Sequence, residues 1–139
     1  MKKLITLLII IGCNSASTPE DSLRRFVYER FKVNSDQELL KNLTVNNMNN
    51  SLLKEEDYLK EKNLFKGIKL KKFKILLKNC ESSVSCFITY IVKYQNENRA
   101  KSMIEVKKIA NILKIDSTWK ISNVSELKTF IKMNDEISP

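Results

Sequence analysis

Residues 73–92 read FKILLKNCESSVSCFITYIV, which is two apolar segments separated by a short polar segment with Cys80 and Cys86 at its ends. Val, Ile and aromatic residues are enriched in the second segment and favour β-strands. The five residues between the cysteines are a common length for a hairpin loop. A hairpin would set the cysteines opposite each other, at a separation that a disulfide can span. The stretch therefore predicts an antiparallel hairpin closed by a Cys80–Cys86 disulfide.

The cysteine pair has two other interpretations. A redox-active pair is the first, although the spacing is not Cys-x-x-Cys and no strand-to-helix redox context is visible. A zinc site is the second, but two cysteines in a chain without histidine leave the tetrahedron incomplete, so no metal site is expected. Closing so short a loop stabilises the fold by only about 2 kcal/mol. The bond is therefore interpreted as a clamp on one hairpin.

Counting outward from the cysteine pair predicts which side chains share a face of the hairpin. One face is expected to carry Phe73, Ile75, Leu77, Phe87, Thr89 and Ile91. The other is expected to carry Lys74, Leu76, Lys78, Ile88, Tyr90 and Val92, with Tyr94 beyond them. The apolar members of this second set are too numerous for a wet surface. Either a terminal helix or a second subunit is expected to cover them, and the latter would make a homodimer.

Helical spacing of apolar residues precedes the hairpin, and strand-like segments follow it. Helices are predicted over residues 19–31, 36–43 and about 51–62, with capping by Thr18 and Ser35 and a loop over residues 46–50. Further strands are predicted over residues 101–115, with a bulge, and 119–124. Ser125 is expected to cap a last helix that carries Leu127, Phe130 and Ile131. The predicted fold is α+β, with N-terminal helices packed on a curved four-stranded antiparallel sheet and a short C-terminal helix.

Helices followed by a curved sheet that closes on Trp119-Lys120-Ile121 resemble the nuclear-transport-factor-2-like, or cystatin-like, fold. The resemblance covers about Pro19 to Val124. It implies a conical pocket between the helices and the sheet, in which enzymes of that fold place Asp, Tyr or His. The corresponding candidates here are Asp57, Tyr58, Tyr90 and Tyr94. The alternative is that the tyrosines are packing residues and Asp57 is solvated.

The N-terminus predicts export. A basic Met1-Lys2-Lys3 precedes an apolar run over residues 4–11, which is shorter than the ~20 residues of a membrane span and suits a signal peptide. Ile10-Ile11-Gly12-Cys13 resembles the lipobox of bacterial lipoproteins, which implies cleavage before Cys13 and attachment of diacylglyceryl and palmitate chains there. An ordinary signal peptide with a chance cysteine is the alternative. The expected organisation is a signal peptide over 1–12, a lipidated tether over 13–18 and a single domain over 19–139.

The chain has a formal net charge of +9 and no histidine. Without histidine it lacks the usual neutral-pH general base and the commonest metal ligand, and neither a Ser–His–Asp set nor a Gly-rich phosphate loop exists. No catalytic residue and no cofactor are therefore expected. Lysines cluster along the first segment of the hairpin: Lys66, Lys69, Lys71, Lys72, Lys74 and Lys78. They either bind anionic groups or protect an edge strand from aggregation, and nucleic-acid binding is not expected of an exported domain.

These observations predict a membrane-anchored envelope lipoprotein with a small non-enzymatic domain that binds a ligand or an envelope protein. The alternative is an enzyme, or a carrier of small hydrophobic molecules, that uses the pocket of the nuclear-transport-factor-2-like fold. The expected partners are the membrane, through the lipid anchor, and either a second copy or another envelope protein.

Overall fold

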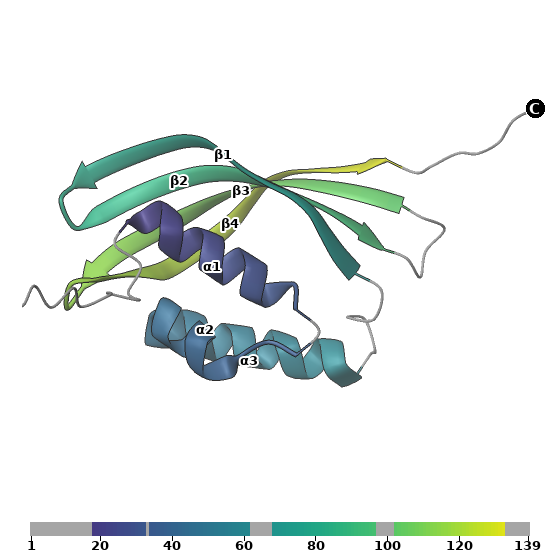
Figure 1. The fold of residues 1–139 in the computed structure, drawn as a ribbon, viewed down its shortest axis with the longest axis horizontal. Coiled ribbons are helices and arrows are strands. Elements are labelled where there is room, and N and C mark those ends of the chain that lie inside the picture. The colour runs from purple at the N-terminus through teal and green to yellow at the C-terminus, as the bar shows by residue number, and fades with distance from the viewer. Residues whose placement is uncertain (1–17, 33, 62–67, 97–101, 133–139) are drawn as a thin grey trace, which may run out of the picture.

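The computed structural model describes residues 18–32, 34–61, 68–96 and 102–132, as three helices followed by one antiparallel sheet (Figure 1). The helices are α1 (Pro19–Arg30), α2 (Gln37–Leu43) and α3 (Asn46–Glu61). The strands are β1 (Ile68–Ser82), β2 (Ser85–Asn96), β3 (Ser102–Ile115) and β4 (Thr118–Lys132), paired in that order. The helices gather on one side of the twisted sheet, with α1 nearest to it, and leave the other face uncovered within the described residues (Figure 1).

Helix α1 begins where the sequence predicts. The Thr18 Oγ1 accepts a hydrogen bond from the Asp21 amide at 3.1 Å, and Pro19 occupies the first turn. Leu23, Phe26 and Val27 are buried at helical spacing and face the sheet. This part of the sequence interpretation is confirmed.

The two following helices differ from the prediction at their N-termini. Asp36, not Ser35, caps α2, because its carboxylate accepts from the amides of Glu38 and Leu39. The loop predicted over residues 46–50 is wrong, since α3 already begins at Asn46 and the Asn49 amide donates to the Val45 carbonyl at 2.9 Å. Packing of the apolar Met48 against the core outweighs the weak helix propensity of the asparagines around it.

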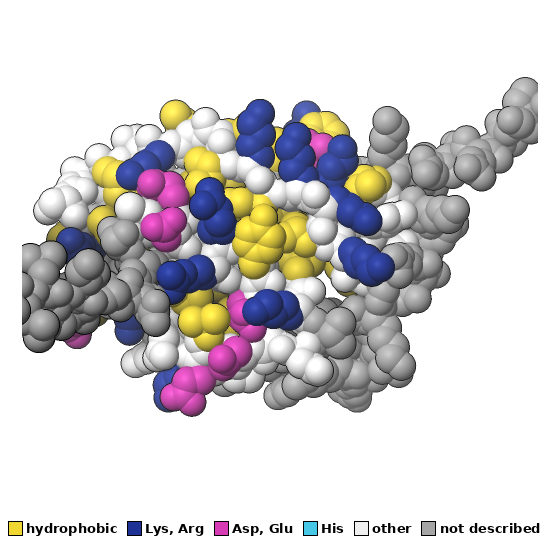
Figure 2. Space-filling view, in the orientation of Figure 1, with side chains coloured by type: hydrophobic (Ala, Val, Ile, Leu, Met, Phe, Trp, Pro, Cys, Tyr) yellow, Lys and Arg dark blue, Asp and Glu magenta, His cyan; other side chains and the backbone are white. Residues whose placement is uncertain are grey.

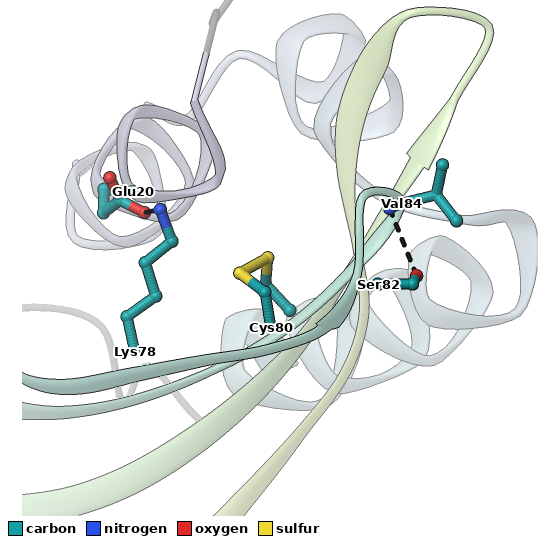
Figure 3. Close-up of a disulfide and its surroundings, with 6 residues drawn as sticks. Glu20, Lys78, Cys80, Ser82 and Val84 are labelled. Carbon is teal, nitrogen blue, oxygen red and sulfur yellow. Dashed lines mark hydrogen bonds and ion pairs between the residues drawn. A yellow bond between two sulfur atoms is a disulfide. The ribbon is translucent and has the colours of Figure 1, made fainter.

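The hairpin predicted around the cysteines is present, and Cys80 pairs with Cys86 both in the strand register and through a disulfide (Figure 3). The turn is tighter than predicted, because β1 continues to Ser82 and β2 begins at Ser85. The Ser82 Oγ accepts from the Val84 amide at 3.2 Å, and the Val84 carbonyl accepts from the Lys114 amide at 2.8 Å. The turn is thereby joined to β3 as well as to its own strands.

The predicted face assignment fails beyond Leu77. A register shift between Ile75 and Leu77 inserts one extra residue in β1, and because side chains alternate with a period of two, it moves residues 72–75 to the opposite face. A second shift between Leu70 and Lys72 reverses the change for the residues before it. Phe73 and Ile75 therefore pair with Val92 and Tyr90 instead of lying on the other face. The prediction holds between Leu77 and the cysteines, where Lys78 pairs with Ile88.

The apolar face that was expected to need a second subunit or a terminal helix is the core of this chain. Ile88, Tyr90 and Val92 are at most 2% exposed and pack in one cluster with Leu23 and Phe26 of α1. Burial of such side chains under the N-terminal helices is the main source of stability in the fold. At the far end, Lys78 reaches Glu20 of α1 with a 2.7 Å ion pair, which Figure 3 shows beside the disulfide.

The predicted C-terminal helix is wrong, and with it the predicted fold class in that detail. Residues 118–132 form β4, which pairs with β3 as far as Met103 and Lys132. Leu127, Phe130 and Ile131 fit helical spacing, but β3 is nearly as long as β4 and offers it a row of backbone hydrogen-bonding groups. The bulge predicted in the strand over residues 101–115 is wrong, because the extra residues are Ser122 and Leu127 of β4, and β3 pairs with β2 without a register shift.

Candidate functional pocket

A pocket of about 440 Å³ lies between the helices and the covered face of the sheet. Its lining comes from α1 and the residue that follows it, from α3, and from all four strands, of which β1 contributes Ile68. The lining residues are Phe26, Val27, Arg30, Phe31, Met48, Leu52, Ile68, Tyr90, Val92, Tyr94, Lys108, Val124 and Glu126. Most of them are apolar, and the volume lies in the range of small-molecule sites, about 300–1,000 Å³.

The floor of the pocket carries one polar row. Tyr90, Lys108 and Glu126 are successive cross-strand partners on β2, β3 and β4, so their side chains lie side by side on the covered face. Val92 and Val124 flank this row within the lining. The pocket thus combines an apolar interior with a small group of hydrogen-bonding side chains.

The two tyrosines of the pocket are held in their neutral form. Burial raises the pKa of the Tyr90 phenol well above its ordinary value, and the negative charge of Glu126 raises that pKa further. The same two causes, burial first, raise the pKa of Tyr94. Both phenols therefore keep their protons at neutral pH and can donate hydrogen bonds to a ligand.

Aromatic contacts hold the tyrosine rings in place. The Tyr90 ring lies 5.7 Å from the Phe73 ring, and the Tyr94 ring lies 5.5 Å from the Phe31 ring, measured between centroids. Both pairs are tilted, as aromatic pairs prefer. The phenol oxygens are thus presented by packed side chains, which limits the ordering that ligand binding requires.

The structure brings together part of the predicted site. Tyr90 and Tyr94 both line the pocket. Asp57 and Tyr58 belong to α3, but their side chains lie outside the described part of the chain. Cys13, the predicted lipidation site, also lies outside it.

Arg30, Lys108 and Glu126 line the pocket and were not foreseen from the sequence. Lys108 lies in a lysine-rich strand whose inward and outward positions could not be separated before the register was known. Glu126 was assigned to the helix that does not form. Residues 126–131 read ELKTFI, which does not alternate between polar and apolar residues, so the local sequence gives no strand signal that could have found Glu126.

Metal ligands do not cluster in the described residues, where no three Cys, Asp or Glu side chains come together. No helix among the described residues has both the length and the apolar character to cross a membrane. The phenol, ammonium, guanidinium and carboxylate groups of the lining can form hydrogen bonds and charge pairs with a bound molecule.

Comparison with known proteins gives a fold relationship only. No protein-family model matches the chain, and no curated protein matches it significantly. Among solved structures, the intermembrane space region of the chloroplast protein ARC6 is similar, with a TM-score of 0.54 and 12% sequence identity over 76% of this chain and 94% of that one. At this identity the likeness shows a shared fold and carries no statement about ligands or partners.

Proposed function

We propose that the chain is a membrane-anchored envelope lipoprotein whose single domain binds a small amphipathic ligand without transforming it. The observation that supports this function is the 440 Å³ apolar pocket with the Tyr90–Lys108–Glu126 row in its floor. An apolar body of the ligand would replace water against Phe26, Val92 and Val124. The polar end of the ligand would lie at the Tyr90–Lys108–Glu126 row.

The charges of the lining favour a ligand with a hydrogen-accepting or anionic end. Among the described lining residues, Arg30 and Lys108 carry positive charges and Glu126 carries a negative one. The neutral phenols of Tyr90 and Tyr94 supply further donors. A fatty acid or a similar single-chain amphiphile combines these features.

A catalytic role for the same pocket has less support. A phenol whose pKa is raised is a poor general base, because the base must be deprotonated near neutral pH. Among the lining residues whose side chains the structure describes, Glu126 is the one carboxylate. A carrier or sensor of a hydrophobic molecule, which the nuclear-transport-factor-2-like resemblance also suggests, needs no general base and no pair of carboxylates.

The membrane anchor rests on the sequence Ile10-Ile11-Gly12-Cys13. Replacement of Cys13 by Ser removes the thiol that carries the lipid, and we expect the variant to leave the membrane fraction or to retain its leader. Mass spectrometry of the native protein would show the acyl groups on Cys13. A variant that stays processed and as firmly membrane-bound as the wild type would refute the anchor.

The ligand can be identified from the protein itself. Purified protein would be extracted with organic solvent, and the extract compared by mass spectrometry with that of the Met48→Trp variant, whose indole fills part of the pocket. The matched control is Val84→Trp, which adds the same ring at an exposed turn outside the pocket. We expect an amphiphile in stoichiometric amount with the wild type and the control, and its loss in Met48→Trp. Equal amounts in all three extracts would refute the pocket as the binding site.

The structure supports a protein partner, whether a second copy or another envelope protein, less than it supports a small ligand in the pocket. The apolar face of β2 that suggested a dimer is covered by α1 of the same chain. The pocket is therefore the better-supported site.

A further inference from the structure

The face of the sheet opposite the helices carries an ordered group of lysines. Cross-strand registers place Lys72, Lys93, Glu105 and Phe130 in one row, and Lys74, Ile91, Lys107 and Lys128 in the next. A further row, next to the one that contains Lys72, begins with Lys69, which pairs with Gln95. We call these six lysines the lysine face: Lys69, Lys72, Lys74, Lys93, Lys107 and Lys128. Figure 2 shows Lys and Arg side chains that follow the course of β1 along the upper right of the molecule.

The lysine face contains cross-strand pairs of like charges, which lower the stability of the sheet. Lys72 stands directly opposite Lys93, and Lys107 stands directly opposite Lys128. Like charges in such positions repel and destabilise a sheet. Glu105 is the only acidic residue in these rows. Within these rows the one carboxylate cannot balance the charges of the lysines. The surface is therefore positive, and an external anion can neutralise it.

Protection of a strand edge explains only part of this pattern. Lysines of β1 can block edge-to-edge aggregation, because β1 is an edge strand. Lys93 and Lys107, however, lie on β2 and β3, which are the central strands. Their lysines have no edge to protect and instead extend the positive charge across the width of the sheet.

Apolar side chains lie among the lysines. The Phe130 side chain is 49% exposed, and the Lys128 ammonium lies 4.7 Å from its ring centroid. Ile91 lies between Lys74 and Lys107 in the same row. A mixture of ammonium groups and partly exposed apolar groups on one broad face suits the headgroup region of a membrane, where lysine stems pack on apolar surface and their charges meet phosphates.

We propose that the lysine face is a docking surface for an anionic phospholipid membrane. It would hold the domain flat against the bilayer with the helices and the pocket turned away from it. The proposal goes beyond the lipid anchor and does not depend on it, because the surface and Cys13 are separate parts of the chain. Together they would bind cooperatively, since one attachment raises the effective concentration of the other.

The test uses the full chain with Cys13→Ser, so that acyl chains play no part. Its co-sedimentation with phosphatidylglycerol vesicles and with phosphatidylcholine vesicles is compared at low and high salt. The test variant carries Lys72→Gln, Lys74→Gln and Lys93→Gln. The matched control removes three positive charges from the helices, with Arg24→Gln, Lys41→Gln and Lys54→Gln, at positions that are exposed. Circular dichroism melting shows that each protein is folded.

We expect salt-sensitive binding to phosphatidylglycerol vesicles that exceeds binding to phosphatidylcholine vesicles. The test variant should lose about a hundredfold of that affinity, from three lysines near a charged membrane surface. The control variant should stay close to the parent protein, and the test variant should melt no lower than the parent because the Lys72–Lys93 repulsion is gone. Equal losses in the two variants, or no preference for the anionic vesicles, would overturn the proposal without bearing on lipidation at Cys13.

Discussion

The Glu29 Oε1 accepts a hydrogen bond of 2.6 Å from the backbone amide of Asp36, and this bond joins the end of α1 to the N-cap of α2. The other carboxylate oxygen of Glu29 lies 2.9 Å from the Lys32 ammonium. Glu29 itself is 3% exposed. A buried carboxylate with two such partners is stabilised in its charged form, and it links the end of α1 to the start of α2.

Acidification should therefore weaken the fold through Glu29. The hydrogen bond from the Asp36 amide, followed by the bond to Lys32, lowers the pKa of Glu29 below its ordinary 4.5. Folding thus favours the deprotonated form, so the stability it contributes is present above about pH 4.5 and is lost as the pH falls through the lower folded value. Glu29→Gln should cost about 1–2 kcal/mol at pH 7 and little at the lowest pH. Urea titrations at several pH values measure this, and Glu81→Gln, at an exposed position, serves as the control.

Removal of the disulfide should destabilise the domain modestly. The bond closes a loop between residues six positions apart, for which chain entropy predicts about 2 kcal/mol. Cys80→Ser with Cys86→Ala avoids a buried hydroxyl at residue 86, which is 2% exposed. Thermal melting with and without reductant should show that the wild type loses stability on reduction and that the double variant does not respond. A wild type that reductant leaves unchanged, with two free thiols by mass analysis, would contradict the assignment.

The β3–β4 turn offers a stabilising substitution. Asp116 and Ser117 both have positive φ, at 50° and 65°. Two such residues in succession are typical of the type I′ hairpin turn, in which glycine is preferred at the second position. Ser117→Gly should therefore raise stability by about 0.5–1 kcal/mol. Ser83→Gly in the other hairpin turn, where φ is not positive, should not raise it, and a denaturant titration of both variants decides.

Alkaline conditions should weaken the fold through Tyr90. The folded-state pKa of this phenol is raised above its ordinary 10.0, first by burial and then by Glu126. Folding thus favours the neutral form, and stability falls as the pH rises above about 10, where the phenol of the unfolded chain ionises. Tyr90→Phe should flatten this part of the pH–stability profile. Tyr28→Phe, at a residue that is 50% exposed, should leave it as it is.

The sequence carried enough information for the local elements but too little for long-range register. Thr18 and Pro19 mark the start of α1 through their own chemistry, and the cysteines mark their hairpin, so both could be predicted. The bulge between Ile75 and Leu77 depends on which side chains the helices bury, and this is set only in the folded chain. The same holds for Leu127 and Phe130, which became strand residues because β3 was available as a partner.

In the pocket, too, the residues of one strand could be predicted and their neighbours on other strands could not. Tyr90 and Tyr94 alternate with apolar residues along one strand, and this pattern could be read before the fold was known. The row that joins Tyr90 to Lys108 and Glu126 requires three strands in register. Residues brought together in that way have no common signal in a single sequence.

A binding titration with the fluorescent fatty acid cis-parinaric acid tests the central claim most directly. The full chain with Cys13→Ser would be compared with the same chain carrying Met48→Trp or Val84→Trp. We predict saturable one-to-one binding by the parent and by Val84→Trp, and its loss in a folded Met48→Trp. Binding of equal strength and stoichiometry in Met48→Trp, or none in the parent, would contradict the assignment of the pocket between α1, α3 and the sheet as the ligand site.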